Sequence, residues 1–256
     1  MARETTISAG SRNIKITIQY DGTAYQGWQR QAVGATIQEI LEKAAATIFQ
    51  QPVHIAGSGR TDAGVHALKQ VANFKVDSAL PLETVLQAMN SLLPRDIAIT
   101  DAEEKPPSFH ARYDALSKAY QYRIHNGPLR SPFLERYCWH IRRALDSDTM
   151  AVAADLLRGR HDFSAFQSSG SDRKTAVRTI TKAAILREGQ NGIIFEIEGD
   201  GFLRYMVRAI VGTLVDVGRG KSTPDDFRAI LESKNRGRAG ATAPPQGLFL
   251  KEVRYR

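Results

Sequence analysis

Two successive runs of strand and helix patterns restrict the fold of this chain more than any other feature of its sequence. In residues 13–20 the apolar and aromatic side chains alternate with polar ones, which is typical of a strand with one buried face. Apolar side chains recur at helical spacing after Thr36, and Glu39 completes the pattern of a capping box. The first run is expected to contain a strand at 13–20, a helix between 36 and 52, strands at 53–56 and 70–76, a helix between 81 and 94, and a strand at 96–102. This order, β-α-β-β-α-β, is the ferredoxin-like arrangement.

The second run repeats this order with longer insertions, after a boundary that Pro106 and Pro107 mark. Its expected elements are a strand at 117–125, a helix at 148–157, paired strands at 179–187 and 193–198, helices at 202–217 and from 224, and a closing strand at 248–255. We therefore predict an α+β fold with a loose tail at 1–12 and ferredoxin-like subdomains at 13–105 and 106–256. Together they would form one broad, mainly antiparallel sheet with a central cleft for the ligand, because clefts between domains are preferred ligand sites.

The balance of charged residues favours a polyanionic partner. Lys and Arg number 35 against 27 Asp and Glu, and the net charge of +8 favours nucleic acid first and an anionic membrane second. The single cysteine, Cys138, cannot form an internal disulfide, which fits a reducing compartment. No apolar run reaches the roughly 18 residues of a membrane helix, and the polar N-terminus shows no signal-peptide core, so we expect a cytoplasmic protein. The six histidines lie far apart without metal-ligand spacing, so no metal site is expected.

A glycine-rich run at residues 57–67 contains the strongest candidate for a functional group. It reads Gly-Ser-Gly-Arg-Thr-Asp-Ala-Gly-Val-His-Ala and places the carboxylate of Asp62 directly after Arg60 and Thr61, with glycines on both sides. Glycine lets backbone approach a ligand closely, and a charged step between glycines is poorly suited to a core. The alternative is a tight turn in which Asp62 caps a backbone group.

Arg208 is a candidate partner for Asp62 from the second half of the chain. In a helix at 202–217 it would lie on the flank of the apolar face, beside Val211 and Val215. A cation there needs solvent or an anion, so Arg208 either covers apolar surface with its stem or pairs with a carboxylate of the other half. In the second case the arginine would lower the pKa of that carboxylate.

Several aromatic and basic side chains suit contact with RNA. Tyr120 and Tyr122 share one face of a strand, where aromatics are most often core but also form the stacking platform for an unstacked base. Basic and aromatic side chains mix just after the proline boundary, in Phe109, His110, Ala111, Arg112 and Tyr113. The polar loop at 162–178 is either a phosphate-contacting arm or disordered. Its basic residues are Arg173, Lys174 and Arg178.

One motif at residues 218–223 imitates a phosphate-binding loop. It contains Gly-Lys-Ser at 220–222, but Val215 stands where such a loop needs its first glycine. The segment also ends a helix, whereas a phosphate-binding loop begins one. We therefore expect a glycine C-cap there and no nucleotide hydrolysis.

Several motifs, in order over nearly the whole chain, resemble those of the tRNA pseudouridine synthase A family. The run at 57–67 is similar to the catalytic motif of that family, and residues 18–29 are similar to its opening. Further matching segments are 109–113, 118–122, 161–163 and 202–208. The resemblance implies an enzyme that converts uridine to pseudouridine at positions 38, 39 and 40 of the tRNA anticodon stem-loop. It also implies a homodimer that works without metal or organic cofactor.

The same resemblance implies roles for single residues. Asp62 would be the catalytic aspartate, and Arg208 would be its partner. Tyr120 would stack on the target base, and Arg60 would help to hold the flipped nucleotide. Ala119 departs from the pattern, because many members carry a larger side chain there. An ionised Asp62 can attack the sugar, attack the base or remove a sugar proton, and the sequence leaves these routes open.

A non-enzymatic RNA-binding module is the main alternative, because such modules share the β-α-β-β-α-β order. They carry a Gly-aromatic-Gly/Ala-Phe signature on the third strand, whereas residues 70–76 read Gln-Val-Ala-Asn-Phe-Lys-Val. A binder also has no use for Asp62 at its substrate, since a carboxylate repels phosphate. The sequence therefore favours the enzyme over the binder and over a basic structural domain.

Overall fold

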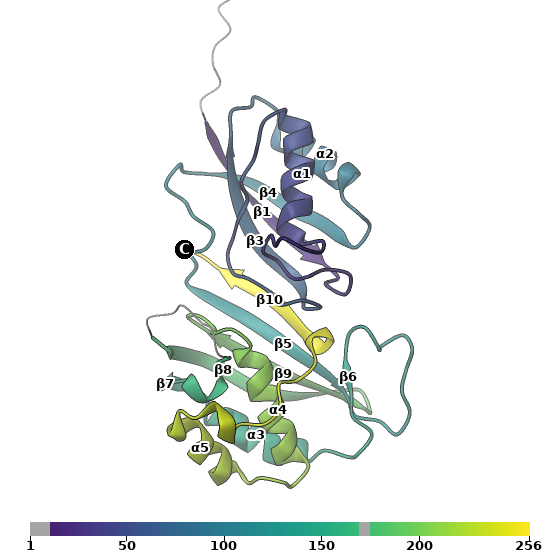
Figure 1. The fold of residues 1–256 in the computed structure, drawn as a ribbon, viewed down its shortest axis with the longest axis vertical. Coiled ribbons are helices and arrows are strands. Elements are labelled where there is room, and N and C mark those ends of the chain that lie inside the picture. The colour runs from purple at the N-terminus through teal and green to yellow at the C-terminus, as the bar shows by residue number, and fades with distance from the viewer. Residues whose placement is uncertain (1–10, 169–174) are drawn as a thin grey trace, which may run out of the picture.

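The computed structural model describes residues 11–168 and 175–256 (Figure 1). Its first half contains β1 (Arg12–Tyr20), α1 (Ile37–Phe49), β2 (Ala56–Gly57), β3 (His66–Val76), α2 (Leu82–Leu92) and β4 (Ile97–Lys105). Its second half contains β5 (Ser117–His125), β6 (Trp139–His140), α3 (Ser147–Asp155), β7 (Gly159–Asp162), β8 (Val177–Glu188), β9 (Gly192–Gly199), α4 (Met206–Gly218), α5 (Pro224–Ser233) and β10 (Leu248–Arg254). Short 3-10 turns lie at Ser164–Phe166, Arg236–Arg238 and Pro245–Gly247.

The ten strands form a single sheet, which confirms the predicted α+β class. The strands lie in the order β4-β1-β3-β10-β5-β9-β8-β7, with β2 paired to β3 and β6 paired to β5. Most pairs are antiparallel, and the parallel ones are β10 with β3 and β5 with β6. Each half has the ferredoxin-like order of its fourth, first, third and second strands, as β4-β1-β3-β2 and β10-β5-β9-β8.

The two halves of the sheet meet where β10 pairs with β3. β10 runs parallel to β3, with Phe249 opposite His66, and antiparallel to β5. β1 occupies one edge of β3 over most of its length. On the other edge, the two-residue β2 pairs only near Asn73, so the end that carries His66 is free to receive β10. A strand from the end of the second half therefore closes the sheet at its centre.

Helices pack together over each half of the sheet. α1 contacts α2 over the first half, and α3 contacts both α4 and α5 over the second (Figure 1). α4 is almost wholly buried, and each large apolar side chain that it removes from water stabilises the fold by roughly 1.5–3 kcal/mol. A Cβ on Gly212 of α4 would lie 1.7 Å from the carbonyl oxygen of Ala241. Glycine is therefore required for the segment before β10 to cross α4.

The helix starts agree with the sequence at α1 and differ from it at α4. The side chain of Thr36 accepts a hydrogen bond from the backbone N of Glu39, as expected for the N-cap. The Glu39 carboxylate does not complete the predicted capping box but pairs with Lys43 at 2.8 Å. α4 begins at Met206, four residues later than predicted, because Tyr205 has a left-handed backbone with φ of 60° that interrupts a right-handed helix.

The end of α4 confirms the predicted glycine C-cap. Gly220 has a positive φ of 69°, its backbone N donates to Val217 O, and the N of Lys221 donates to Asp216 O. These two bonds form a Schellman motif. The Gly-Lys-Ser segment thus ends a helix, and the rejection of a phosphate-binding loop agrees with the structure.

The remaining differences concern short or extended strands. β6 and β7 were not predicted, because two and four residues are too few to show a period. The short strand predicted at 53–56 lies instead at Ala56–Gly57. Arg12, assigned to the tail by the sequence, belongs to β1. The rest of the predicted tail falls mainly on residues 1–10, outside the described residues.

Candidate active site

Buried hydrogen bonds fix the turn that carries Asp62 between β2 and β3. Ser58 donates from its backbone N to Val71 O over 2.7 Å and from its hydroxyl to Gln70 Oε1 over 2.6 Å. Gln70 Nε2 donates in turn to the carbonyl of Gly59 over 3.0 Å. The side chains of Ser58 and Gln70 are fully buried. The start of the turn therefore cannot move without leaving buried polar groups unpaired, which is costly.

Further hydrogen bonds hold the turn directly beside Asp62. Thr61 Oγ1 lies 2.8 Å from the hydroxyl of Tyr20, and the carbonyl of Thr61 accepts from the backbone N of Trp28 over 3.1 Å. The backbone N of Val65 donates to the carbonyl of Asp62 itself over 3.1 Å. Groups from β1 and from the loop after it thus hold Thr61 before the carboxylate, and the bond from Val65 holds the backbone after it.

Two glycines allow that loop to lie so close to the turn. A Cβ on Gly22 would lie 2.0 Å from Val65 O, and a Cβ on Gly27 would lie 2.4 Å from Thr61 O. Gly27 also has a φ of 87°, a conformation that strains any other residue. Residues 18–29 were singled out by their resemblance to a family, which does not predict this packing role. Two glycines five residues apart, next to buried aromatic side chains, are the signal that points to it.

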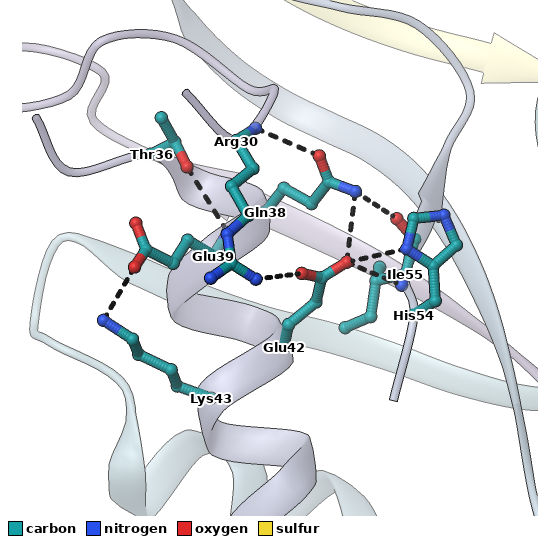
Figure 2. A network of polar contacts seen from close by, with 8 residues as sticks. All are labelled: Arg30, Thr36, Gln38, Glu39, Glu42, Lys43, His54 and Ile55. Atoms are coloured by element: carbon teal, nitrogen blue, oxygen red, sulfur yellow. Dashed lines mark hydrogen bonds and ion pairs between the residues drawn. The ribbon is translucent and has the colours of Figure 1, made fainter. Parts of the chain in front are cut away.

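A polar network supports the same loop from the side of α1 (Figure 2). Glu42 of α1 accepts from the backbone N of Ile55 over 3.1 Å and lies 3.1 Å from His54 Nδ1. Its other oxygen lies 3.9 Å from Arg30 of the loop. The network joins the loop, α1 and the segment that leads into β2. A shallow surface hollow lies beside Arg30, and Asp62 is not among the residues that line it.

Asp62 meets Arg208, which lies in the first turn of α4. Arg208 Nη1 is 3.3 Å from Asp62 Oδ2, and the two side chains are 13% and 24% exposed. Arg208 Nε donates to the carbonyl of Ala243 over 2.7 Å, and the N of Ala243 donates back to the carbonyl of Arg208 over 3.0 Å. The structure thus brings the predicted partners together. It adds a carbonyl, from the segment before β10, that holds the guanidinium.

Burial and charge act on Asp62 in opposite directions. Burial raises the pKa of the Asp62 carboxyl above its ordinary value, and the positive charges of Arg208 and Arg204 offset this rise only in part. The expectation that Arg208 lowers this pKa is confirmed, but burial outweighs the ion pair, so the pKa of Asp62 lies above its ordinary value. The arginines prevent the larger rise expected of an unpaired buried acid.

Tyr120 lies near the ion pair, whereas Tyr122 belongs to the core. Tyr120 is 8% exposed, and its ring packs edge-on against Phe202 with the centroids 5.0 Å apart. Burial raises the pKa of the Tyr120 hydroxyl, and the nearby charge of Asp62 adds to the rise. Tyr122 is fully buried, and its hydroxyl donates over 2.7 Å to a backbone carbonyl just before β10. Of the two tyrosines, Tyr120 is thus the one placed to meet a ligand at Asp62.

The segment predicted to contact RNA after the proline boundary lies only partly at the surface, and the prediction is wrong for Ala111, because this residue is fully buried in the core. The residues of the segment are Phe109, His110, Ala111, Arg112 and Tyr113. Asn73 of β3 fixes the backbone here, donating to the carbonyl of Phe109 over 3.3 Å and accepting from the N of Ala111 over 2.8 Å. Arg112 and Tyr113 are exposed and lie together, with 5.6 Å from the guanidinium carbon to the ring centroid. The contacts of this segment do not reach the ion pair.

The other predicted basic contacts differ in their placement. Arg60 is exposed, two residues before Asp62. Arg173 and Lys174 lie outside the described residues. Arg178 is only 8% exposed and donates from Nη1 to the carbonyl of Thr175 over 3.1 Å. The prediction of a phosphate contact is therefore wrong for Arg178, because its buried guanidinium donates to the backbone carbonyls of Thr175 and Val177.

His66, inside the glycine-rich run, joins the two halves of the molecule. It is 1% exposed, its Nδ1 accepts from the N of Gly22 over 3.0 Å, and its Nε2 lies 3.2 Å from Gln246 O. Its ring stacks on Phe249 with the centroids 4.7 Å apart. Burial lowers the pKa of His66, and the nearby carboxylate of Asp21 only partly offsets this. The imidazole is therefore a neutral structural link, which the sequence analysis did not single out.

The described residues contain neither a metal-binding cluster nor a membrane-spanning helix. Within 11–168 and 175–256, no three His, Cys, Asp or Glu side chains lie together so that they could hold a metal ion. No helix in these ranges is long and apolar enough to cross a membrane. Cys138 is half-buried, and burial raises the pKa of its thiol, which makes it a poor nucleophile.

Comparisons with known proteins match nearly the whole chain. A family model described as tRNA pseudouridine synthase matches residues 16–114 and 153–256. The protein "tRNA pseudouridine synthase A" of Geotalea uraniireducens (strain Rf4) is 49% identical over 244 residues, which are 95% of this chain and 100% of the relative. Proteins of the same name from Thermoanaerobacter sp. (strain X514) and Acetivibrio thermocellus are each 48% identical with the same coverage. The matched ranges include both Asp62 and Arg208.

Proposed function

The chain belongs to the tRNA pseudouridine synthase family, and from this premise we propose that Asp62 is the catalytic residue of a uridine isomerisation. The ion pair carries the proposal. A largely buried carboxylate, on a turn fixed on both sides, lies 3.3 Å from an arginine of the other half. A buried ion pair is a weak source of stability. A carboxylate whose pKa is perturbed by both burial and a charged partner is a good candidate for chemistry.

The reaction of this family needs a carboxylate and no co-reactant. The bond from N1 of uracil to C1′ of ribose breaks, and a bond from C5 to C1′ forms. C5 loses a proton and N1 gains one, so the atoms balance within an isomerisation. Asp62 acts in its ionised form, by attack on the sugar, by attack on the base or by removal of a sugar proton. Arg208 orients the carboxylate and favours that ionised form against burial.

Tyr120 is proposed as the surface on which the flipped base stacks. Its place near Asp62 supports this role, as does its edge-on packing against Phe202, which a base could join. Extrusion of a base costs a few kcal/mol, and stacking on an aromatic ring offsets roughly 1–3 kcal/mol of that cost.

The tRNA backbone is proposed to contact basic side chains around this centre. Arg60 is exposed next to Asp62 and suits a phosphate of the flipped nucleotide. The exposed side chains of Arg112 and Tyr113 suit a more distant part of the tRNA, and the same role is proposed for Arg173 and Lys174. The net charge of +8 supports a polyanionic substrate.

Further parts of the proposal concern the target and the assembly. We propose that the targets are positions 38, 39 and 40 of the anticodon stem-loop and that the enzyme acts in the cytoplasm as a homodimer. The shared name and full-length similarity of the curated relatives support a tRNA substrate, and the positions, the dimer and the compartment rest on the family resemblance of the motifs. Sequencing of tRNA after selective modification of pseudouridine tests the positions. Sedimentation equilibrium of the purified protein tests the dimer.

Tritium release from tRNA labelled at C5 of uridine tests the catalytic role directly. Wild type should release tritium, whereas Asp62→Ala and the isosteric Asp62→Asn should bind tRNA on a filter but release none. Release by Asp62→Asn at the wild-type rate would contradict the role of the carboxylate. Binding without release by the wild type would favour the RNA-binding module instead.

A further inference from the structure

Tyr205 has a backbone conformation that is unusual for its position at the N-cap of α4. Its φ and ψ are 60° and 4°, in the left-handed region. Among the described residues, the other non-glycine positions with positive φ are Gln50 and Lys234. Both of these end a helix, where a left-handed residue is common. Tyr205 instead begins one, and N-cap residues normally have an extended backbone.

The capping of α4 does not account for this conformation. Tyr205 makes no side-chain hydrogen bond to the start of the helix, which is what a capping side chain would provide. A bulky side chain in the left-handed region is strained, and such residues persist where the surrounding structure requires them, often at active sites. The strained backbone of Tyr205 therefore indicates that its side chain has a role of its own.

The ring of Tyr205 contacts the two arginines that act on Asp62. The guanidinium carbon of Arg208 lies 4.9 Å from the ring centroid, and that of Arg204 lies 5.0 Å from it. Both distances are within the range of cation–π attraction. Arg208 pairs with Asp62, and the charge of Arg204 lowers the pKa of the same carboxyl. One aromatic ring thus contacts both cations that counteract the burial of the carboxylate.

We propose that Tyr205 is a positioning residue for the isomerisation, and that its ring holds the guanidinium groups of Arg208 and Arg204 beside Asp62. The inference rests on the proposed catalytic role of Asp62. Arg208 has a second anchor in the carbonyl of Ala243, but Arg204 is exposed. The described contacts of Arg204 are those with the ring and the hydroxyl of Tyr205, and a hydrogen bond that its carbonyl accepts from the backbone N of Ser168.

The contact of both arginines with one ring explains the left-handed backbone of Tyr205. Arg208 follows Tyr205 by three residues, a spacing at which side chains of one helix meet. Arg204 precedes Tyr205 directly and lies outside the helix, so the chain must turn sharply at Tyr205 for both cations to reach one ring. The carbonyl of Tyr205 accepts a hydrogen bond from the backbone N of Ala209 over 2.9 Å, so α4 begins directly after the turn.

The groups that face Asp62 make a pH profile informative. These are Arg208 and Arg204 from the start of α4 and Tyr120 from β5, whose hydroxyl stays neutral because burial raises its pKa. Loss of the ring should loosen the two arginines and leave Tyr120 unchanged. The pKa of Asp62 should then rise further, because the two described cations that lower it are less well placed.

Tyr205→Asn and Tyr205→Phe test the proposal in a tritium-release assay. Asparagine tolerates the left-handed region, so Tyr205→Asn removes the ring while keeping the turn, and Tyr205→Phe keeps the ring. We expect kcat/KM to fall about tenfold in Tyr205→Asn and its acid limb to move to higher pH. Tyr205→Phe should resemble wild type in both respects. Gln50→Asn, the same substitution type at another left-handed site, should change neither.

Three outcomes would overturn the positioning role. An acid limb that stays in place in Tyr205→Asn while thermal stability falls would indicate a purely structural residue. A raised KM with unchanged kcat and limb would indicate a ring that stacks on the substrate. A wild-type profile in Tyr205→Asn would show that the arginines need no ring. Activity in Asp62→Asn, by contrast, would overturn the proposed catalytic residue itself, whatever Tyr205 does.

Discussion

The turn that carries Asp62 is held through its backbone, whereas the end of α4 that carries Arg208 is held largely through side chains. On the first side, glycines at 22 and 27 let one loop pack directly on the carbonyls of Thr61 and Val65. On the second side, the guanidinium of Arg208 lies between a carbonyl and an aromatic ring. The turn of Asp62, the residue proposed to react, is thus held by close backbone packing. Arg208, which favours the ionised form of Asp62, is held by contacts that a single substitution can change.

Substitution of Arg208 should give the largest effect, because it removes the only ion pair of the buried carboxylate among the described residues. Arg208→Ala is expected to raise the activation free energy by about 3–5 kcal/mol, which lowers kcat/KM a hundredfold or more. The kcat/KM of Arg208→Lys should lie between those of wild type and Arg208→Ala, since an ammonium group keeps the charge but cannot reproduce the planar contacts to both Asp62 and Ala243. Tritium release measures both variants. A wild-type rate in Arg208→Ala would show that the pair is not needed.

A substitution on the rigid side should act on folding first. Gly27→Ala places a methyl group 2.4 Å from Thr61 O at a φ of 87°, and we expect the free energy of unfolding to fall by roughly 2–3 kcal/mol. Gly220→Ala is the matched control, because it has a φ of 69° with nothing within 4 Å. Gly220→Ala should lower the free energy of unfolding by only about 1 kcal/mol. Urea unfolding compares the two, and equal losses would mean that close packing on the turn contributes nothing.

The smallest effect is expected at His66, through pH. Burial holds the pKa of His66 below its ordinary value of 6.5, so the unfolded chain takes up a proton at a higher pH than the folded protein does. The contribution to stability is therefore complete above pH 6.5 and is lost as pH falls toward the folded pKa. Wild type should lose stability over this interval, and His66→Gln should lose less. His54→Gln, at an exposed histidine, serves as control and should keep the wild-type slope.

Local periodicity explains which parts of the fold could be predicted from the sequence. β1 alternates along its length and α1 has its own start signal at Thr36, so both were found almost to the residue. β3 was predicted four residues too short, because its extension to His66 is paired by the distant β10 and, past a register shift, by Tyr20 of β1. His66 and its partner Gln246 are 180 residues apart. No local pattern reports such a partner.

The same limit applies to the candidate site. The pairing of Asp62 with Arg208, 146 residues apart, was one of two alternatives for an arginine on the flank of an apolar helix, and only the family resemblance favoured it. The sign of the pKa shift could not be predicted, since burial of Asp62 depends on distant segments that cover it. Tyr205 could not be predicted either, because aromatic residues carry no sequence signal for a left-handed backbone.

The central position of β10 sets the time at which the enzyme can become active during its synthesis. A ribosome completes β3 and the Asp62 turn long before it reaches residues 243–250, which supply the carbonyl for Arg208 and the strand beside His66. Until then the free edge of β3 is exposed to pairing with other chains. At this stage the first half of the nascent chain cannot pair with β10, and the site around Asp62 lacks the carbonyl that holds Arg208. Translational pauses in the last quarter of the sequence therefore prolong an inactive, aggregation-prone stage.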